Sequence, residues 1–130
     1  MTIRRLDHVA IPVSDMGPML TFYTSLGFTV DDSMAPLMHS VCHGDMKLNL
    51  HDPVLWKSDF DLRGPTAQPG SGDICLVWDG TEAELIDYLA DVEIIEGPVK
   101  RTGGKNTGSA VGTSRYIRDP EQNLVEFIIY

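Results

Sequence analysis

The stretch HVAIPV at residues 8–13 alternates apolar and other side chains with a period of two residues. Val9, Ile11 and Val13 fall on one face of this segment, as they do in a half-buried β-strand. His8 falls on the opposite face. The pattern therefore predicts a strand that buries its β-branched side chains and presents an imidazole on its other side.

After this strand the apolar spacing becomes that of a helix, and three more strands follow. Ser14 is the expected N-cap of the helix, and Gly27 is its expected C-terminal stop. The expected elements of this first half are a helix over residues 15–25 and strands over residues 28–32, 38–42 and 46–51.

Proline and glycine punctuate residues 52–72, which are expected to form a connecting loop. The order of elements then returns, and the stretch DICLVWDG coincides with HVAIPVSD when the halves are superposed. The expected elements of the second half are strands over residues 73–78, 92–95, 115–118 and 123–130 and a helix over residues 82–90. The sequence thus predicts an internal repeat, with repeat 1 over about residues 3–52, a linker over 53–72 and repeat 2 over 73–130.

Two such units predict an α+β fold. We expect one domain over residues 1–130, in which two βαβββ repeats form a curved mixed sheet around a cleft, with the helices on its convex face. A chain of 130 residues, 42% of them hydrophobic, has room for one compact domain of this kind.

Side-chain alternation along the strands sorts the polar residues between the two faces of the sheet. The residues placed on the cleft side are His8, Asn49, His51, Asp73 and Glu126. If residues 44–45 form a two-residue hairpin turn, His39 and His43 face the helix and are discounted as ligands; a different turn length would reverse this assignment.

The charge of the chain limits its partners. A net charge of -9 and a pI near 4.6 argue against nucleic acid and anionic membranes, since either needs a positive protein face. No apolar run approaches the roughly 20 residues of a membrane span. Cys42 and Cys75 lie in apolar runs and no leader segment is recognised, so free thiols and a cytoplasmic location are expected.

Two imidazoles and a carboxylate are the ligand set of open divalent metal sites, which makes His8, His51 and Glu126 candidate ligands. A cation held in this way polarises a substrate oxygen or makes a neighbouring C–H or water more acidic. Each residue also has a structural interpretation. His8 and His51 would be hydrogen-bonded strand residues, Asp73 the polar start of a strand, and Glu126 the partner of Arg115 in an ion pair.

The segments LDHVAIPVSDMGPMLTFYTSLGF (residues 6–28) and YIRDPEQNLVEFI (residues 116–128) resemble the vicinal oxygen chelate superfamily. Its members include glyoxalase I, fosfomycin-resistance proteins, extradiol dioxygenases, methylmalonyl-CoA epimerase and bleomycin-binding proteins. The second segment is similar to the superfamily's DP-x-GN-x-x-E signature. Gln122 departs from it, and is expected either to adopt a left-handed conformation at a cost of about 1 kcal/mol or to alter the turn.

The resemblance implies that His8 and Glu126 are metal ligands on the first and last strands. The superfamily usually has histidine where this chain has Asp73, and the repeat counterpart of Glu126 is Asn49. Three outcomes stay open. His8, Asp73 and Glu126 hold the ion, with His51 as a catalytic or substrate-contacting group; or His8, His51 and Glu126 hold it; or no metal binds. The ion would be zinc, manganese, nickel or iron.

The glycine-rich segment of residues 97–114 carries three basic residues in an otherwise acidic chain. It is expected either to be a solvated loop or to close over the cleft as a lid that attracts a carboxylate, phosphate or thiolate conjugate. Arg101 of this segment, together with Asn49 and Arg115, is expected to contact the substrate.

Two functions from different classes follow. In the first, the chain is a metal-dependent lyase, isomerase or ring-cleaving dioxygenase that acts on a small molecule with vicinal oxygens, and Glu126 or His51 moves the proton. In the second, the chain is a metal-free protein that sequesters an aromatic or drug-like ligand, as bleomycin-binding proteins do. The resemblance also implies a homodimer, with the cleft closed within one chain or between two swapped chains.

Overall fold

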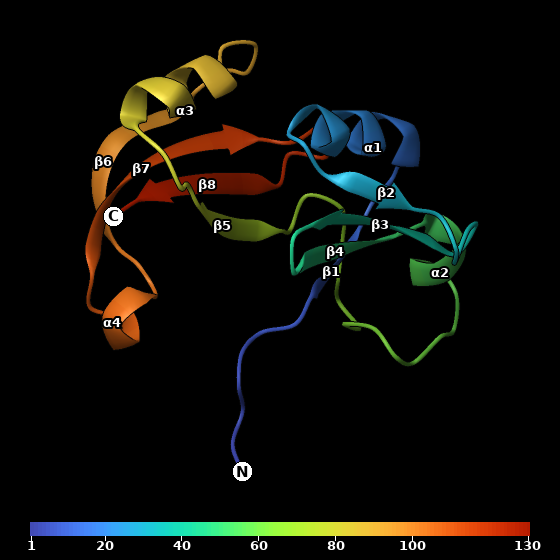
Figure 1. The fold of residues 1–130 in the computed structure, drawn as a ribbon. Coiled ribbons are helices and arrows are strands. Elements are labelled where there is room, and N and C mark those ends of the chain that lie inside the picture. Colours follow the sequence, from blue (N-terminus) through green and yellow to red (C-terminus); the bar gives the residue numbers. More distant parts are fainter. The chain divides into compact units, whose positions relative to one another are not determined.

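The computed structural model describes residues 1–130, which form two compact units, Met1–Ser71 and Gly72–Tyr130. Each unit contains one strand–helix–strand–strand–strand repeat (Figure 1). The predicted α+β fold with two βαβββ units is therefore confirmed. That the repeats enclose a common cleft stays a prediction.

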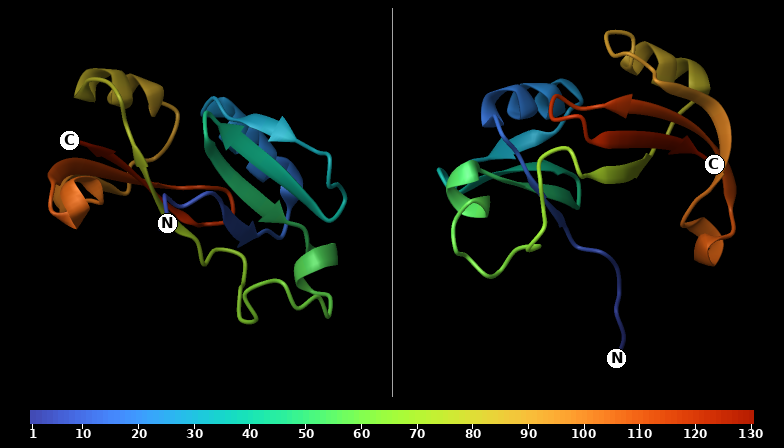
Figure 2. Two further views of the ribbon diagram at one scale, coloured as in Figure 1. Left: turned by 60° about the horizontal axis from the view of Figure 1, so that its bottom comes forward. Right: turned by 180° about the vertical axis from the view of Figure 1, so that it is seen from behind.

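A four-stranded sheet and one long helix build the first unit. Its elements are β1 (Val9–Pro12), α1 (Met16–Ser25), β2 (Thr29–Asp31), β3 (Met38–His43), β4 (Met46–His51) and the short helix α2 (Pro53–Trp56). The strand order is β1-β4-β3-β2; β1 runs parallel to β4, and the other pairs are antiparallel. Helix α1 lies along one face of this sheet (Figure 2), and Met19 and Tyr23 of α1 are fully buried.

The β3–β4 hairpin has the register that the sequence predicts. His43 pairs with Met46 and His39 pairs with Leu50, across a turn in which Gly44 has a φ of 54°. A glycine tolerates this left-handed conformation without steric cost. Because fully buried Leu50 belongs to the helix side of the sheet, His39 lies on that side too.

The second unit repeats this architecture. Its elements are β5 (Asp73–Val77), α3 (Glu82–Tyr88), β6 (Glu96–Thr102), the short turn α4 (Lys105–Gly108), β7 (Val111–Arg118) and β8 (Leu124–Ile129). The order β5-β8-β7-β6 matches that of the first sheet, with the parallel pair again between the first and last strands of the repeat. Helix α3 begins with a capping box between Thr81 and Glu84, and Tyr88 at its end packs edge-on against Phe127.

Two predictions about the first half are wrong in detail. The N-cap of α1 is Asp15 and not Ser14. The linker is not only a loop, because it contains α2, whose N-cap Asp52 accepts a hydrogen bond from the Val54 amide at 3.0 Å. Pro53 is the first residue of α2, a position at which proline favours a helix instead of breaking it.

The interpretation of residues 97–114 as a loop is also wrong. The strand predicted at residues 92–95 lies at Glu96–Thr102, and it pairs with β7 from Val111 onward. This hairpin is irregular at its tip, where Asn106 and Thr107 have φ values of 54° and 55°, and between Glu96 and Val99, where the register with β7 shifts. The glycines of this segment are typical of a loop, but its backbone groups form the hydrogen bonds of the β6–β7 ladder.

The turn between β7 and β8 is held by two buried side chains. Asp119 accepts hydrogen bonds from the Glu121 and Asn123 amides, both at 3.0 Å. Asn123 accepts one from the Gly72 amide at 2.7 Å and donates to Asp119 at 2.9 Å. Gln122 between them has a φ of 71°, so the first of its two predicted alternatives, the left-handed conformation, is confirmed.

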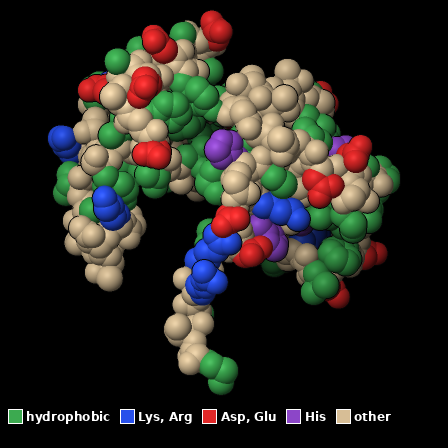
Figure 3. Space-filling model, in the orientation of Figure 1, with side chains coloured by type: hydrophobic (Ala, Val, Ile, Leu, Met, Phe, Trp, Pro, Cys, Tyr) green, Lys and Arg blue, Asp and Glu red, His purple; other side chains and the backbone are tan.

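The surface agrees with the acidic composition. Figure 3 shows acidic side chains scattered over the face in view and basic side chains on the extended N-terminal segment, whose sequence contains Arg4 and Arg5. No helix has the length and apolar character that crossing a membrane requires.

Candidate functional site

Each sheet has one face covered by its helix and one face turned away from it, which we call the first and second open faces. In the first unit the strand register pairs Ala10 with Asn49 and Pro12 with His51. Side-chain alternation then places His8, Ala10, Asn49 and His51 together on the first open face, as the sequence predicts.

The polar side chains of the first open face differ in their surroundings. His8 precedes β1, and its Nδ1 lies 2.7 Å from a carboxylate oxygen of Asp7, in a pair that is exposed to solvent. Asn49 is buried and accepts a hydrogen bond from Ser40 at 2.8 Å. His51 is half-buried, and burial lowers its pKa below the ordinary value of 6.5. His51 is therefore a neutral imidazole at pH 7, the form that binds metal ions or accepts protons.

A cavity of about 570 Å³, called here the first cavity, opens on this face. His8, Asn49 and His51 line its floor. Its walls come from the β2–β3 connection and from α2 with the residues after it, including Leu55, Phe60 and others of the linker. These wall residues were not predicted, because the linker was expected only to connect the two repeats.

The second open face carries Asp73, Cys75 and Glu126. Cys75 pairs with Glu126 in the parallel register, as Ala10 pairs with Asn49 in the first sheet. The Glu126 carboxylate accepts a hydrogen bond from Ser114 at 2.5 Å. The half-buried carboxylate is thus held by a hydroxyl of β7, and Asn49 is confirmed as its repeat counterpart.

Glu126 changes the acidity of its neighbours. Burial raises the pKa of the Cys75 thiol to about 12, and the adjacent Glu126 carboxylate adds to this effect. Tyr116 of β7 pairs with Glu126 of β8, and burial raises the pKa of its hydroxyl. A hydrogen bond from Arg101 lowers this pKa, whereas the charge of Glu126 raises it further. Cys75 is therefore a protonated thiol at neutral pH and a weak nucleophile.

The two arginines expected to contact substrate lie in different places. Arg101 donates a hydrogen bond from Nε to the Tyr116 hydroxyl at 3.0 Å, so it adjoins the second open face. Arg115 pairs with Phe127 on the helix side of the sheet, is buried, and forms an ion pair with Glu82 of α3. The predicted Arg115–Glu126 ion pair is wrong, and the position of Arg115 favours a structural role over contact with substrate.

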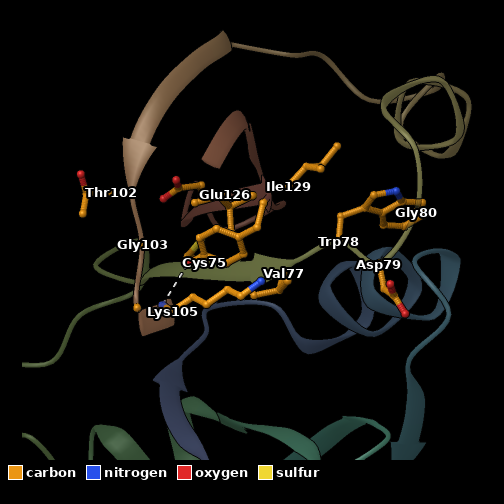
Figure 4. A pocket seen from close by; sticks show the side chains of 13 residues that line it. Cys75, Val77, Trp78, Asp79, Gly80, Thr102, Gly103, Lys105, Glu126 and Ile129 are labelled. Atoms are coloured by element: carbon orange, nitrogen blue, oxygen red, sulfur yellow. Dashed lines mark hydrogen bonds between the residues drawn. The ribbon is translucent and has the colours of Figure 1, made fainter. Parts of the chain in front are cut away.

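A larger cavity of about 820 Å³, the second cavity, lies on the second unit (Figure 4). Cys75 and Glu126 lie along the sheet, and Trp78 stands where β5 ends. At the hairpin tip, the Lys105 amide donates to the Tyr130 hydroxyl at 3.3 Å, and the Lys105 ammonium lies 5.3 Å from the ring centre. This cavity therefore combines apolar walls with charges of both signs.

Neither unit by itself brings three His, Cys, Asp or Glu side chains into a group able to hold a metal ion. The first open face offers the two imidazoles of His8 and His51, and the second offers the carboxylates of Asp73 and Glu126. Nitrogen and oxygen donors of these types suit zinc, manganese, nickel and iron. The donor chemistry therefore fits the predicted metal, with two candidate ligands in each repeat.

Comparison with known proteins supports one superfamily. Residues 5–127 match the family model described as Glyoxalase/Bleomycin resistance protein/Dioxygenase superfamily. The chain is 36% identical over its whole length to the glyoxalase domain-containing protein RDO1 of Mycosarcoma maydis, of which it covers 70%. It is 34% identical to the virulence protein STM3117 of Salmonella typhimurium, covering 87% of that protein.

Solved structures agree. The crystal structure of STM3117 has a TM-score of 0.84, with 100% of this chain and 99% of that chain covered. An integron cassette protein from Vibrio cholerae also has a TM-score of 0.84, at 32% identity, with 100% of this chain and 98% of that chain covered.

Proposed function

The chain belongs to the Glyoxalase/Bleomycin resistance protein/Dioxygenase superfamily, and from this premise we propose that it is a metal-dependent enzyme acting on a small molecule with vicinal oxygens. The observation that carries the proposal is the pair of imidazoles, His8 and His51, on one face at the floor of the first cavity. Two imidazoles on one wall of a small-molecule cavity are typical of a metal or proton-transfer site.

The surroundings of His8 support a role as ligand. A metal-binding histidine commonly gives its second ring N–H to a carboxylate, which fixes the ring and makes the free nitrogen more basic. Asp7 stands in that position, 2.7 Å from Nδ1, and leaves Nε2 for the ion. In this hydrogen bond the His8 Nδ1 atom carries the hydrogen, because an ionised carboxylate accepts and does not donate.

The second repeat supplies the negative charge that the first open face lacks. Glu126 and Asp73 are its candidate ligands, and the ligands meet either within one chain or between the chains of a homodimer. When bound, the ion polarises a substrate oxygen and makes the neighbouring C–H more acidic. Two ligand sets stay open, His8, His51 and Glu126 or His8, Asp73 and Glu126.

The remaining polar groups have roles in moving and placing protons. In the second ligand set, His51 is a neutral imidazole that takes a proton from the substrate, since burial lowers its pKa. Ser114 holds one oxygen of Glu126 at 2.5 Å and so fixes the direction of the carboxylate. Arg101, bonded to Tyr116 beside Glu126, offers a positive charge to an anionic part of the substrate.

A second candidate function is metal-free binding of an apolar ligand. Two observations favour it: Asn49, an amide without charge, occupies the position that corresponds to Glu126, and most of the wall of the first cavity is apolar. A sequestering protein needs the cavity but does not need His8 as a ligand.

Metal binding separates these functions. Protein purified without a metal-affinity tag is assayed by elemental analysis and by calorimetric titration with Mn²⁺, Fe²⁺, Ni²⁺ and Zn²⁺. We expect about one ion per site, loss of binding in His8→Ala and Glu126→Gln, and binding about 10- to 100-fold weaker in Asp7→Asn. His43→Ala is the matched control, because His43 packs against Phe28 away from the open face. Less than about a tenth of an equivalent, with no gain on adding metal, contradicts the enzyme proposal.

A further inference from the structure

The walls of the first cavity are apolar, and part of this apolar surface is open to solvent. Phe60 is 44% exposed, Val54 59% and Leu62 81%. Met34 and Leu37 from the β2–β3 connection extend the same lining. Contiguous exposed apolar surface around a few convergent polar groups is typical of a ligand site.

The cavity also lacks charge. No Lys, Arg, Asp or Glu is among its lining residues, in contrast to the second cavity, which includes Lys105 and Glu126. The segment that presents Phe60 carries two acidic residues, Asp59 and Asp61, and two basic ones, Lys57 and Arg63, so its charges balance. An anionic group on a ligand would therefore find no lysine or arginine to pair with in the lining of this cavity.

The wall after α2 is held by short local interactions. Trp56 of α2 donates to the Val13 carbonyl at 2.9 Å, which ties α2 to the end of β1. Beyond it, Arg63 bonds the backbone carbonyls of Ser58 at 3.3 Å and Gly64 at 3.4 Å, and the Phe60 amide donates to the Ser58 hydroxyl at 3.2 Å. The segment that presents Phe60 is thus closed on itself beside a fixed helix.

We propose that Phe60 and Leu62 determine which molecules enter the first cavity, and that its ligand presents an uncharged apolar group, a ring or a branched alkyl chain, to them. The volume of about 570 Å³ lies in the range of small-molecule sites. The polar floor of His8, Asn49 and His51 then faces the oxygen-bearing end of the ligand. The inference names the substrate class of the proposed function, but it does not depend on the metal.

Two probes of the same ring system test the proposal. 2-Naphthol is uncharged near neutral pH, and 2-naphthoate is its anionic counterpart. Each is titrated into EDTA-treated full-length protein, and amide signals are followed by two-dimensional NMR. We expect 2-naphthol to shift signals of residues lining the first cavity and to bind at least about tenfold more tightly than 2-naphthoate.

Variants then locate the determinants. Phe60→Ala and Leu62→Ala are each expected to weaken 2-naphthol about tenfold, because both remove apolar contact with the ring. Val111→Ala is the matched control: Val111 is 60% exposed and lines neither cavity, so its variant should stay within about twofold. The same spectra show that each variant is folded.

Three results would overturn the inference. The first is equal affinity for the two probes, and the second is an affinity for 2-naphthol that neither truncation changes. The third is a second copy of the chain on this wall, revealed by a sedimentation coefficient that falls in Phe60→Ala. Because no metal is present, failure here leaves the metal proposal standing, and absence of metal binding leaves this inference standing.

Discussion

Replacing Asn123 with alanine tests how the turn before β8 sets the second open face. Asn123 has no exposed surface, and its side chain joins the Gly72 amide to the Asp119 carboxylate. Leu124 in turn donates its amide to the Gly72 carbonyl at 2.9 Å. These bonds fix the start of β5 against the start of β8, and with it the position of Asp73.

The cost of Asn123→Ala can be worked out from these contacts. The variant loses one neutral hydrogen bond, worth about 1 kcal/mol, and one bond to a carboxylate, worth about 1.5–3 kcal/mol. It also leaves the buried Asp119 oxygen without that donor. We expect the free energy of unfolding to fall by about 3 kcal/mol, which moves the urea midpoint by about 1.5 M at a typical slope of about 2 kcal/mol per M.

Urea unfolding followed by the fluorescence of Trp78, in a Trp56→Phe background, reports on the second unit. Gln122→Gly in the same turn is the matched control, because glycine relieves the left-handed residue and should be neutral or stabilising by up to about 1 kcal/mol. A midpoint shift below about 0.5 M for Asn123→Ala would refute the reasoning.

A companion variant, Asn123→Asp, keeps the acceptor for Gly72 but replaces the donor to Asp119 with a second carboxylate. Two adjacent carboxylates cannot both ionise cheaply, so the folded state raises the pKa of the pair above its unfolded value. The raised pKa means that stability is retained at low pH and is lost as pH rises through the carboxyl range. The stability of this variant relative to the original chain should therefore fall between about pH 4 and pH 7.

Two further variants test contacts of the second unit. The pKa of Cys75 is raised to about 12, so iodoacetamide should alkylate this thiol slowly near pH 8 in a Cys42→Ser background. Glu126→Gln should speed the reaction, because it removes the charge that adds to the shift. Rapid alkylation of Cys75 with Glu126 in place would contradict this expectation. A methyl group on Gly112 would overlap the Ile129 carbonyl oxygen, which belongs to the backbone, whereas one on Gly104 meets nothing. Thermal unfolding should therefore show a loss of about 1–3 kcal/mol for Gly112→Ala relative to Gly104→Ala, and equal stabilities would contradict the close approach of these strands.

Alternation along the strands was sufficient to predict the face of most site residues. His8, Asn49 and His51 share one face because each strand residue points opposite to its neighbours, whatever its tertiary surroundings. The hairpin register followed from Gly44, since a left-handed glycine fixes a two-residue turn. These features depend on local geometry that the sequence specifies directly.

The elements that the sequence did not reveal depend on context. Pro53 favours a helix only as its first residue, so its effect depends on where the helix begins. The glycines near β6 are usually loop residues, and pairing with β7 overrode that preference. The ion pair of Arg115 with Glu82 and the hydrogen bond from Ser114 to Glu126 join different elements, so predicting them required the tertiary arrangement of β7, β8 and α3. Phe60 and Leu62 carry no periodic signal, so only the course of the chain after α2 identifies them as cavity walls.

The central claim is that both repeats contribute to one metal site, and paramagnetic broadening by Mn²⁺ tests it most directly. At about one equivalent of Mn²⁺, NMR signals of Ala10 and Asn49 in the first repeat and of Cys75 and Glu126 in the second should broaden together, since relaxation falls steeply with distance from the ion. Signals of Ile86, an exposed residue of α3 on the other side of the second sheet, should be affected least. Broadening confined to one repeat, or spread evenly over the chain, would contradict the claim.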